Sequence, residues 1–474
     1  MNLPRLIEKE SIIFLQNMID TNIEFLNCDL TEVLNLFESG NDINVKHRLK
    51  EADGKFVNTI TINGKVFAYG NFVGEILDPI CHRRLLKRYA KLSLYKALSK
   101  FFEKELPWGA LTGIRPTKLA YQQIKESGEF EEFFMDTMKV SEQKTNLIKN
   151  VLSTQKNIYK IDEENTDFFV FIPFCPSRCK YCSFISADIK SANKYVDEYV
   201  DTLIDEIEFS KKFIKNLRSI YIGGGTPVAL SNSQLERVLS AIDSINTGVE
   251  YTVEAGRPDA ITKENLKILK DHGVTRICIN PQTFIDKTLV SLGRNHTSAQ
   301  VEEKYLMAKD MFDVNMDLIA GLEGETFLDF KYSLDKAISL SPENITVHTL
   351  CIKKGSRLAE SEQRLSGEVA KNMVEYAHQS LGENGYFPYY LYRQKYMAGN
   401  LENVGYTKRD KACVYNVDIM EEISSNVACG ANAISKRIFN GGERIERTAS
   451  PKDVITYLNK IETIKKEKEK LFFD

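Results

Sequence analysis

Three cysteines, Cys175, Cys179 and Cys182, have the spacing C-x3-C-x2-C and directly follow an apolar segment typical of a strand. Cysteine thiolates in such loops hold iron–sulfur clusters. Three protein ligands on a cubane cluster leave one iron open, and a substrate or cofactor can bind there. A zinc site needs a fourth ligand nearby, and no second Cys or His pair closely follows Cys182. Three unrelated core thiols are the remaining alternative, and the sequence favours the iron–sulfur site over both.

A second feature is the turn Gly223-Gly224-Gly225-Thr226, which ends the next predicted strand. Consecutive glycines let the backbone approach a ligand closely and present N–H and C=O groups to it. The turn lacks the Lys-Ser/Thr of a nucleotide-triphosphatase loop and the spaced glycines of a dinucleotide fingerprint. Its position is more informative than its composition, because we expect it beside the cysteine loop at the same end of a sheet.

Polar residues recur at the later strand ends, namely Glu254, Gln282, Asp317 and, in the segment after the fourth strand, Arg294. An acid within an apolar strand costs several kcal/mol unless it is paired or bound to a ligand, so each needs a partner. Asp317 could bond to neighbouring backbone or to an arginine, Glu254 could pair with Arg257, and Arg294 could cap a helix. Gathered at one sheet end, these groups could instead bind a zwitterion that carries ribose hydroxyls.

The elements that must position these residues alternate from about residue 165 onward between short β-branched or aromatic runs and amphipathic segments. This alternation requires a parallel sheet with right-handed crossovers. Six units are too few for a closed eight-stranded barrel, so we predict an α/β fold with a partial (β/α)6 TIM-type barrel and chemistry at the strand ends. The six predicted strands begin at Phe168, Ser219, Glu250, Arg276, Val314 and Asn344.

The flanking regions differ from this core. We predict an α+β accessory domain over 1–160, the partial barrel over 161–365 and a C-terminal, substrate-side extension over 366–474. Asn63-Gly64 between alternating apolar residues predicts a hairpin. Residues 82–100 carry seven Lys or Arg and no acid, which suits either a solvated helix face or a site for an acidic partner.

Bulk composition excludes several classes. The chain has 63 Lys and Arg against 66 Asp and Glu, so a net charge of -3 gives no general attraction to nucleic acid or to an anionic membrane. The N-terminus lacks a signal-peptide pattern and no run of 18 apolar residues follows, which favours the cytoplasm. Nine scattered cysteines in a chain of this length indicate thiolate and metal chemistry rather than disulfides.

Several of these motifs resemble those of a known enzyme family. FIPFCPSRCKYCSF, YIGGGTP, NPQTF, LGRNHT and MDLIAGLEGET resemble segments of the oxygen-independent coproporphyrinogen III oxidase family of radical S-adenosylmethionine (SAM) enzymes, and in particular its coproporphyrinogen dehydrogenase branch. The resemblance covers about residues 165–440. It implies a [4Fe–4S] cluster and SAM as cofactors, and it implies that the open iron binds the amino and carboxylate groups of SAM.

The resemblance also assigns residues. Cys175, Cys179 and Cys182 would be the cluster ligands, and Arg294 would meet the SAM carboxylate. Glycines and side chains around them would bind the rest of SAM, with Tyr181 lying against it, Gly224, Gly225 and Thr226 at the methionine moiety, and Glu254, Gln282 and Asp317 at the remaining polar groups including the ribose. No catalytic side chain beyond these is identified.

The family reaction removes carbon dioxide from two propionates of coproporphyrinogen III and leaves vinyl groups, giving protoporphyrinogen IX. The implied partners are this tetrapyrrole and a one-electron donor such as ferredoxin or flavodoxin. Ser183-Phe184 after the third cysteine resembles the branch of heme-binding chaperones, so a heme chaperone that keeps the fold is an alternative. Another radical SAM reaction on a tetrapyrrole is a second alternative.

Overall fold

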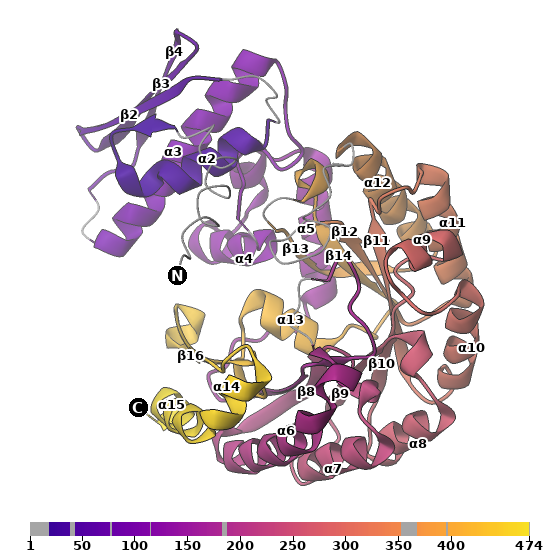
Figure 1. The fold of residues 1–474 in the computed structure, drawn as a ribbon. Helices are drawn as coiled ribbons and strands as arrows, with labels where there is room; N and C mark the ends of the chain where they lie inside the picture. The colour runs from indigo at the N-terminus through magenta and orange to yellow at the C-terminus, as the bar shows by residue number, and fades with distance from the viewer. Residues whose placement is uncertain are drawn as a thin grey trace, which may run out of the picture. The chain divides into compact units, whose positions relative to one another are not determined.

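The computed structural model describes residues 19–37, 43–75, 78–113, 115–182, 187–351, 367–394 and 397–473 (Figure 1). The chain divides into two compact units, 1–148 and 149–474. In the described ranges, no helix is both long and apolar enough to cross a membrane. The assignment of functional domains with limits at 160 and 365 stays a prediction.

Unit 1 is an α+β structure whose sheet has the order β1-β2-β3-β4. The predicted hairpin is confirmed, because Asn63 and Gly64 both have positive φ, at 46° and 86°, between paired strands β3 and β4. The basic segment lies in α3, where Lys87 pairs with Asp29 of α2 and Leu94 and Leu98 are buried. The elements of this unit are β1 (Asp20–Thr21), η1 (Glu24–Leu26), α2 (Asn27–Asn35), β2 (Val45–Ala52), β3 (Lys55–Ile62), β4 (Lys65–Phe72), α3 (Pro79–Phe102), α4 (Pro116–Ser127), the π-helix η2 (Phe133–Thr137) and α5 (Glu142–Gln155), which contains the boundary.

Unit 2 contains the six predicted strands, all of them parallel to their neighbours within this set. The parallel order β5-β8-β9-β10-β11-β12 is that of the predicted partial barrel, and helices follow the outer side of the curved sheet (Figure 1). Strand residues are buried almost throughout, as parallel strands covered on both faces must be. The strands are β5 (Asn165–Ile172), β8 (Asn216–Gly224), β9 (Glu250–Gly256), β10 (Arg276–Ile279), β11 (Asp313–Ala320) and β12 (Asn344–Thr349), and the short pair β6 (Phe174–Cys175) and β7 (Ala187–Asp188) follows β5.

The connecting helices begin where the sequence predicts. Ser231 and Thr262 each cap a helix through a reciprocal capping box with a residue three positions later. The helices between strands are α6 (Ile189–Ser210), α7 (Asn232–Asp243), α8 (Lys263–Asp271), α9 (Asp286–Ser291), α10 (Ser298–Ala308) and α11 (Phe327–Leu340), with single turns η3 (Lys211–Phe213), η4 (Pro227–Ala229) and η5 (Pro258–Ala260).

The C-terminal region extends this sheet at both ends. One hairpin adds antiparallel strands beside β12, and a second set adds β15, parallel to β5, followed by two antiparallel strands. Helix α13 packs against both β8 and β13, which are far apart in the sheet order, so the sheet curls around it. These elements are α12 (Gly367–Glu383), β13 (Phe387–Tyr392), η7 (Ala398–Asn400), β14 (Asn403–Thr407), α13 (Val414–Glu421), β15 (Ser425–Cys429), β16 (Ile434–Phe439), η8 (Asn440–Gly442), β17 (Arg444–Ala449), α14 (Val454–Asn459) and α15 (Ile461–Phe473).

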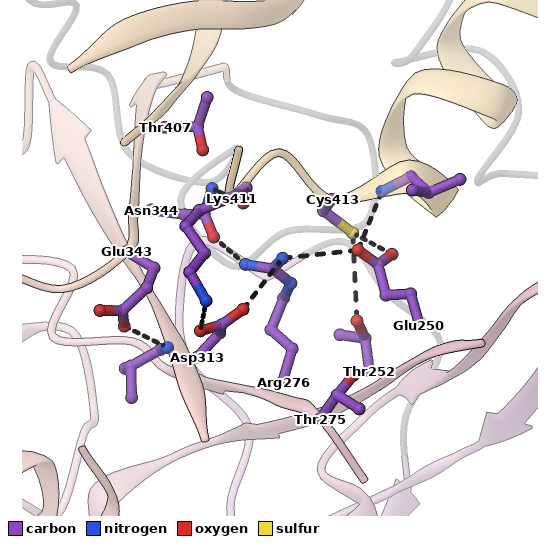
Figure 2. Close-up of polar contacts among 12 residues, drawn as sticks. Glu250, Thr252, Thr275, Arg276, Asp313, Glu343, Asn344, Thr407, Lys411 and Cys413 are labelled. Atoms are coloured by element: carbon purple, nitrogen blue, oxygen red, sulfur yellow. Dashed lines mark hydrogen bonds and ion pairs between the residues drawn. The ribbon is translucent and has the colours of Figure 1, made fainter. Parts of the chain in front are cut away.

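A buried arginine organises the edge at which the strands begin. Figure 2 shows Arg276 of β10 with its guanidinium between Asn344, Glu250 and Asp313, the two carboxylates at 3.4 and 3.7 Å. Glu250 also accepts hydrogen bonds from the backbone N–H groups of Val414 and Tyr415, at 3.0 and 3.2 Å, where α13 begins. The network therefore fixes α13 at this edge, and the cysteine loop lies at the opposite one.

Candidate active site

The cysteine loop begins at the carboxyl end of β5. Cys175 ends β6, Cys179 is buried, and the Cys182 N–H donates to the Cys179 carbonyl over 3.2 Å. None of the nine cysteines forms a disulfide. Within the described ranges no group of three or more Cys, His, Asp or Glu side chains is arranged as a metal site, and Ser183-Phe184 lie outside those ranges. The three cluster ligands therefore stay a prediction, while their loop and its supports are described below.

The glycine turn after β8 is bonded directly to the cysteine loop. The Gly225 N–H donates to the Ile172 carbonyl and the Thr226 N–H to the Phe174 carbonyl, both over 2.7 Å, and the Thr226 hydroxyl lies 3.5 Å from the Cys175 sulfur. A Cβ on Gly225 would lie 2.4 Å from the Phe174 oxygen and 3.0 Å from that sulfur. Sequence reasoning expected glycine here for approach to a ligand, and the structure shows that it also permits approach to the cysteine loop.

Arg257, which directly follows β9, supports the loop, a role that sequence reasoning missed. Its guanidinium donates to the Ser177 carbonyl and hydroxyl at 3.0 and 2.6 Å. Its other nitrogens bind the Asp259 carboxylate at 2.9 and 2.6 Å, so the alternative pairing with Glu254 is not the one formed. The spacing Arg-Pro-Asp was visible in the sequence, but its target lies 80 residues away along the chain.

Arg294 reaches the loop from the segment after α9. It donates to the Tyr181 hydroxyl over 2.8 Å and to the Asn280 carbonyl over 2.7 Å. Its Nε and the Asn280 Oδ1 are buried and have no hydrogen-bond partner. Tyr181 itself packs against a buried apolar group made up of Leu292, Ile319, Leu322 and Leu350. The structure thus joins predicted residues Arg294 and Tyr181 and leaves two buried polar atoms beside them for a ligand.

Glu254, near the end of β9, faces the glycine turn. The Tyr221 hydroxyl donates to its Oε1 over 2.6 Å, and a Cβ on Gly223 would lie 3.2 Å from its carboxyl group. Burial raises the pKa of Glu254 to about 7, an effect that Asp317 reinforces and that the Tyr221 bond opposes. Glu254 can therefore hold or release a proton near neutral pH.

Asp317 of β11 finds its partners on neighbouring strands. It accepts a 2.8 Å hydrogen bond from the Asn315 side chain, and the His348 Nε2 lies 3.7 Å from its second oxygen. Burial alone would raise the pKa of Asp317, but these contacts outweigh burial and lower it. The other ring nitrogen of His348 lies 3.4 Å from the Tyr392 hydroxyl. Sequence reasoning did not single out His348, whose partners come from two other strands.

Gln282 lies between β10 and β11, with φ at 67°. Its N–H donates to the Asp317 carbonyl over 2.8 Å, and its carbonyl accepts from Ile319 over 2.9 Å. These backbone bonds add Gln282 to the edge of β11, next to Asp317. Glu254 and Asp317 lie in the second halves of β9 and β11, and Gln282 follows β10, so the fold brings these three predicted residues toward the carboxyl end of adjacent strands.

Aromatic rings line the adjoining part of the fold. Tyr415 of α13 stacks on Tyr221 and on Phe169, with ring centroids 4.3 and 5.9 Å apart. Tyr390 and Tyr392 of the tyrosine-rich segment stack on each other at 6.4 Å. Phe169 is thus part of an aromatic group.

The comparisons agree with this architecture. A sequence model of the radical SAM superfamily matches residues 169–337. The "oxygen-independent coproporphyrinogen-III oxidase-like protein HemZ" of Bacillus subtilis (strain 168) is 35% identical over 402 residues, 81% of this chain and 79% of that protein. The "heme chaperone HemW" of Lactococcus lactis subsp. lactis (strain IL1403) is 34% identical over 239 residues, 48% of this chain and 62% of its own. The solved coproporphyrinogen III oxidase HemN of Escherichia coli shares the fold, with a TM-score of 0.52 and 19% identity over 69% of this chain and 73% of its own.

The match of residues 169–337 to the superfamily model, together with the partial-barrel fold, defines this chain as a radical SAM protein. Within that superfamily, the extent and identity of the match to HemZ show that the chain belongs to the family of oxygen-independent coproporphyrinogen-III oxidase-like proteins. Members of this superfamily use a [4Fe–4S] cluster and SAM.

Proposed function

We propose that the protein binds a [4Fe–4S] cluster on Cys175, Cys179 and Cys182 together with SAM, and oxidatively decarboxylates the propionates of coproporphyrinogen III to vinyl groups. The observation that carries the proposal is the bonding of the cysteine loop to the glycine turn at the strand ends, in a chain 35% identical to HemZ over most of its length. We also propose that the protein acts in the cytoplasm and receives electrons from a small one-electron donor such as ferredoxin or flavodoxin.

The residues present fit these cofactors. The Arg294 Nε is a buried, unpartnered donor and the Asn280 Oδ1 a buried, unpartnered acceptor, which suit the carboxylate and ammonium ends of an amino acid. Gly224 has φ at 115° and a Cβ there would lie 2.8 Å from the Ile172 carbonyl, so a side chain is excluded from the turn. When bound, the cofactors supply one-electron reduction and hydrogen abstraction, which no side chain of the site can provide.

The chain's own residues then bind and orient the cofactors. Arg257 and the glycine turn hold the cysteine loop against β5 and β8, Arg294 positions Tyr181, and Asp317 stays ionised as an acceptor for hydroxyl groups. Glu254 accepts a hydrogen bond from the Tyr221 hydroxyl, and its carboxyl group is a second hydrogen-bond acceptor of the site. The stacked rings of Phe169, Tyr221 and Tyr415 give the adjoining surface an aromatic character that suits a macrocycle.

Anaerobic turnover tests the proposal. Reconstituted, reduced protein with SAM and coproporphyrinogen III should yield protoporphyrinogen IX and carbon dioxide, both followed by liquid chromatography and mass spectrometry. The Cys179→Ala variant should lose the activity and most of the bound iron, because one of three ligands is removed. Iron bound by the variant at the wild-type level would contradict the assigned ligand set.

A second candidate function is heme binding and delivery, supported by the similarity to HemW over 48% of this chain. Under this alternative the protein binds heme with micromolar or tighter affinity and forms no protoporphyrinogen. Heme titration followed by absorption spectroscopy, performed on the same reconstituted sample as the turnover assay, separates the two functions. A third candidate, another radical SAM reaction on a tetrapyrrole, would appear as a different product mass.

A further inference from the structure

A lysine, a cysteine, a glutamate and a serine meet in the core of unit 2, away from the cysteine loop in sequence. Lys468 belongs to α15, Glu206 and Ser210 to α6, and Cys429 is the last residue of β15. Lys468 is 1% exposed, and Glu206 and Cys429 are 0% exposed. Lysine and glutamate are almost never buried to this degree unless they are paired, and these two form an ion pair.

The Lys468 ammonium is the centre of this cluster. Its Nζ lies 2.8 Å from the Glu206 Oε1, 3.0 Å from the Ser210 hydroxyl and 3.4 Å from the Cys429 sulfur. The second Glu206 oxygen accepts from the Tyr457 hydroxyl at 2.6 Å and from the Gly430 N–H at 2.7 Å. Both the carboxylate and the amine are therefore held in place, and the amine is held against the thiol.

We propose that Cys429 and Lys468 form a redox-sensitive pair which dioxygen converts into a covalent S–O–N bridge between β15 and α15. The nitrogen and the sulfur are already in contact at 3.4 Å, and the bridge needs only a further small approach of the two side chains, because two single bonds through one bent oxygen span less than this distance. The site is enclosed, so a small apolar oxidant reaches it more readily than a charged one does. Ser210 and Glu206 remain as hydrogen-bonding partners of the bridged nitrogen.

The step balances with dioxygen as the oxidant. The Cys429 S–H bond, two Lys468 N–H bonds and the O=O bond break, and one S–O bond, one O–N bond and the two O–H bonds of a water molecule form. Sulfur and nitrogen each give up two electrons, and dioxygen takes up all four. Burial raises the pKa of the Cys429 thiol to about 11, so it starts protonated, and the proton left over from the ammonium passes to Glu206.

The bridge would link the end of the chain to the strand beside the cysteine loop. β15 pairs with β5, whose last residue Ile172 lies three positions before Cys175. Tyr199 connects the same parts, since its hydroxyl donates to the Phe171 carbonyl over 2.7 Å and accepts from the Ala431 N–H over 3.1 Å. Exposure to oxygen would therefore produce a covalent link behind β5 that lasts until a thiol reduces it.

The test uses the full-length protein, purified under argon and divided into an argon half and an air-exposed half. Both are digested with trypsin without reductant and analysed by mass spectrometry. We expect the peptide 412–436 joined to the peptide 467–470, with the summed mass plus one oxygen and minus two hydrogens, in the air-exposed half alone. Dithiothreitol should separate the two peptides.

Variants fix the assignment. Cys429→Ser and Lys468→Arg should give no joined peptide, and Lys465→Arg, also on α15 but paired with Asp205, should give the same amount as wild type. A joined peptide without the added oxygen, or an unjoined Cys429 after prolonged exposure to air, would overturn the proposal. If the Cys429 and Lys468 variants do not fold, the comparison of the argon and air-exposed halves of the wild-type protein decides the proposal.

Discussion

At the scale of single residues, two carboxyl groups of the site have their pKa values moved in opposite directions. Against the cost of burial, Glu254 has the Tyr221 hydroxyl, nearby backbone and an electrostatic contribution from His348, whereas Asp317 has Asn315, Thr346 and a direct bond to His348. The site therefore presents one carboxylate that is ionised throughout the physiological range and one that titrates within it.

Glu254→Gln should change the pH dependence of stability. Because the pKa of Glu254 in the folded protein, about 7, lies above its ordinary value of 4.5, the wild type loses stability as the pH rises from one value to the other. The variant lacks this loss, so it should gain about 2 to 3 kcal/mol more over wild type at pH 8 than at pH 5. Urea unfolding at both pH values measures the difference, and an equal gain at the two values would refute the assignment.

Arg294→Lys should weaken SAM binding by about tenfold to a hundredfold, because lysine cannot hold Tyr181 and a carboxylate at once. Anaerobic equilibrium dialysis of the reconstituted protein gives the dissociation constant. Arg237→Lys, an exposed position on α7 that pairs with Asp201, is the matched control and should bind SAM as wild type does. Equal affinities for all three proteins would remove Arg294 from the binding site.

At the scale of elements, the six strands of the barrel could be predicted because each is a local run of buried residues, and several of the helices between them, such as α7 and α8, begin at a capping residue. Strands β13 to β17 were not predicted. Their pairing with β12 and β5 joins segments as far apart as Phe168 and Val427, and no local periodicity encodes such a partner. For the same reason, candidate site residues could be selected from their types near strand ends and stay a prediction, whereas the contacts of His348 and Arg257 could not be foreseen.

The contact between the glycine turn and the cysteine loop gives a prediction at this scale. Gly225→Ala would force a Cβ into the Phe174 carbonyl, so the turn and the loop must separate, and the iron content after reconstitution should fall several-fold. Gly382→Ala, within α12 and with no atom within 4 Å of the added Cβ, should leave the iron content unchanged. Iron analysis of both variants with matched protein concentration checks this.

At the scale of the whole molecule, the C-terminal region is part of the sheet that carries the site. A chain ending at residue 422 would lack β15 and expose β5, whose residues are almost all buried. We expect this shortened protein to aggregate, as judged by the soluble fraction and by size-exclusion chromatography. A soluble monomer with the circular dichroism of wild type, scaled for length, would show that β5 tolerates an open edge.

The supports of the cysteine loop have a consequence for how the protein matures. Backbone bonds from Gly225 and Thr226 and the side chain of Arg257 hold this loop through main-chain and serine oxygen atoms, and the Thr226 hydroxyl adds a 3.5 Å contact to the Cys175 sulfur. We therefore expect these supports to form before any iron is delivered. Cluster assembly becomes a separate, later event that the cell can time to its iron supply.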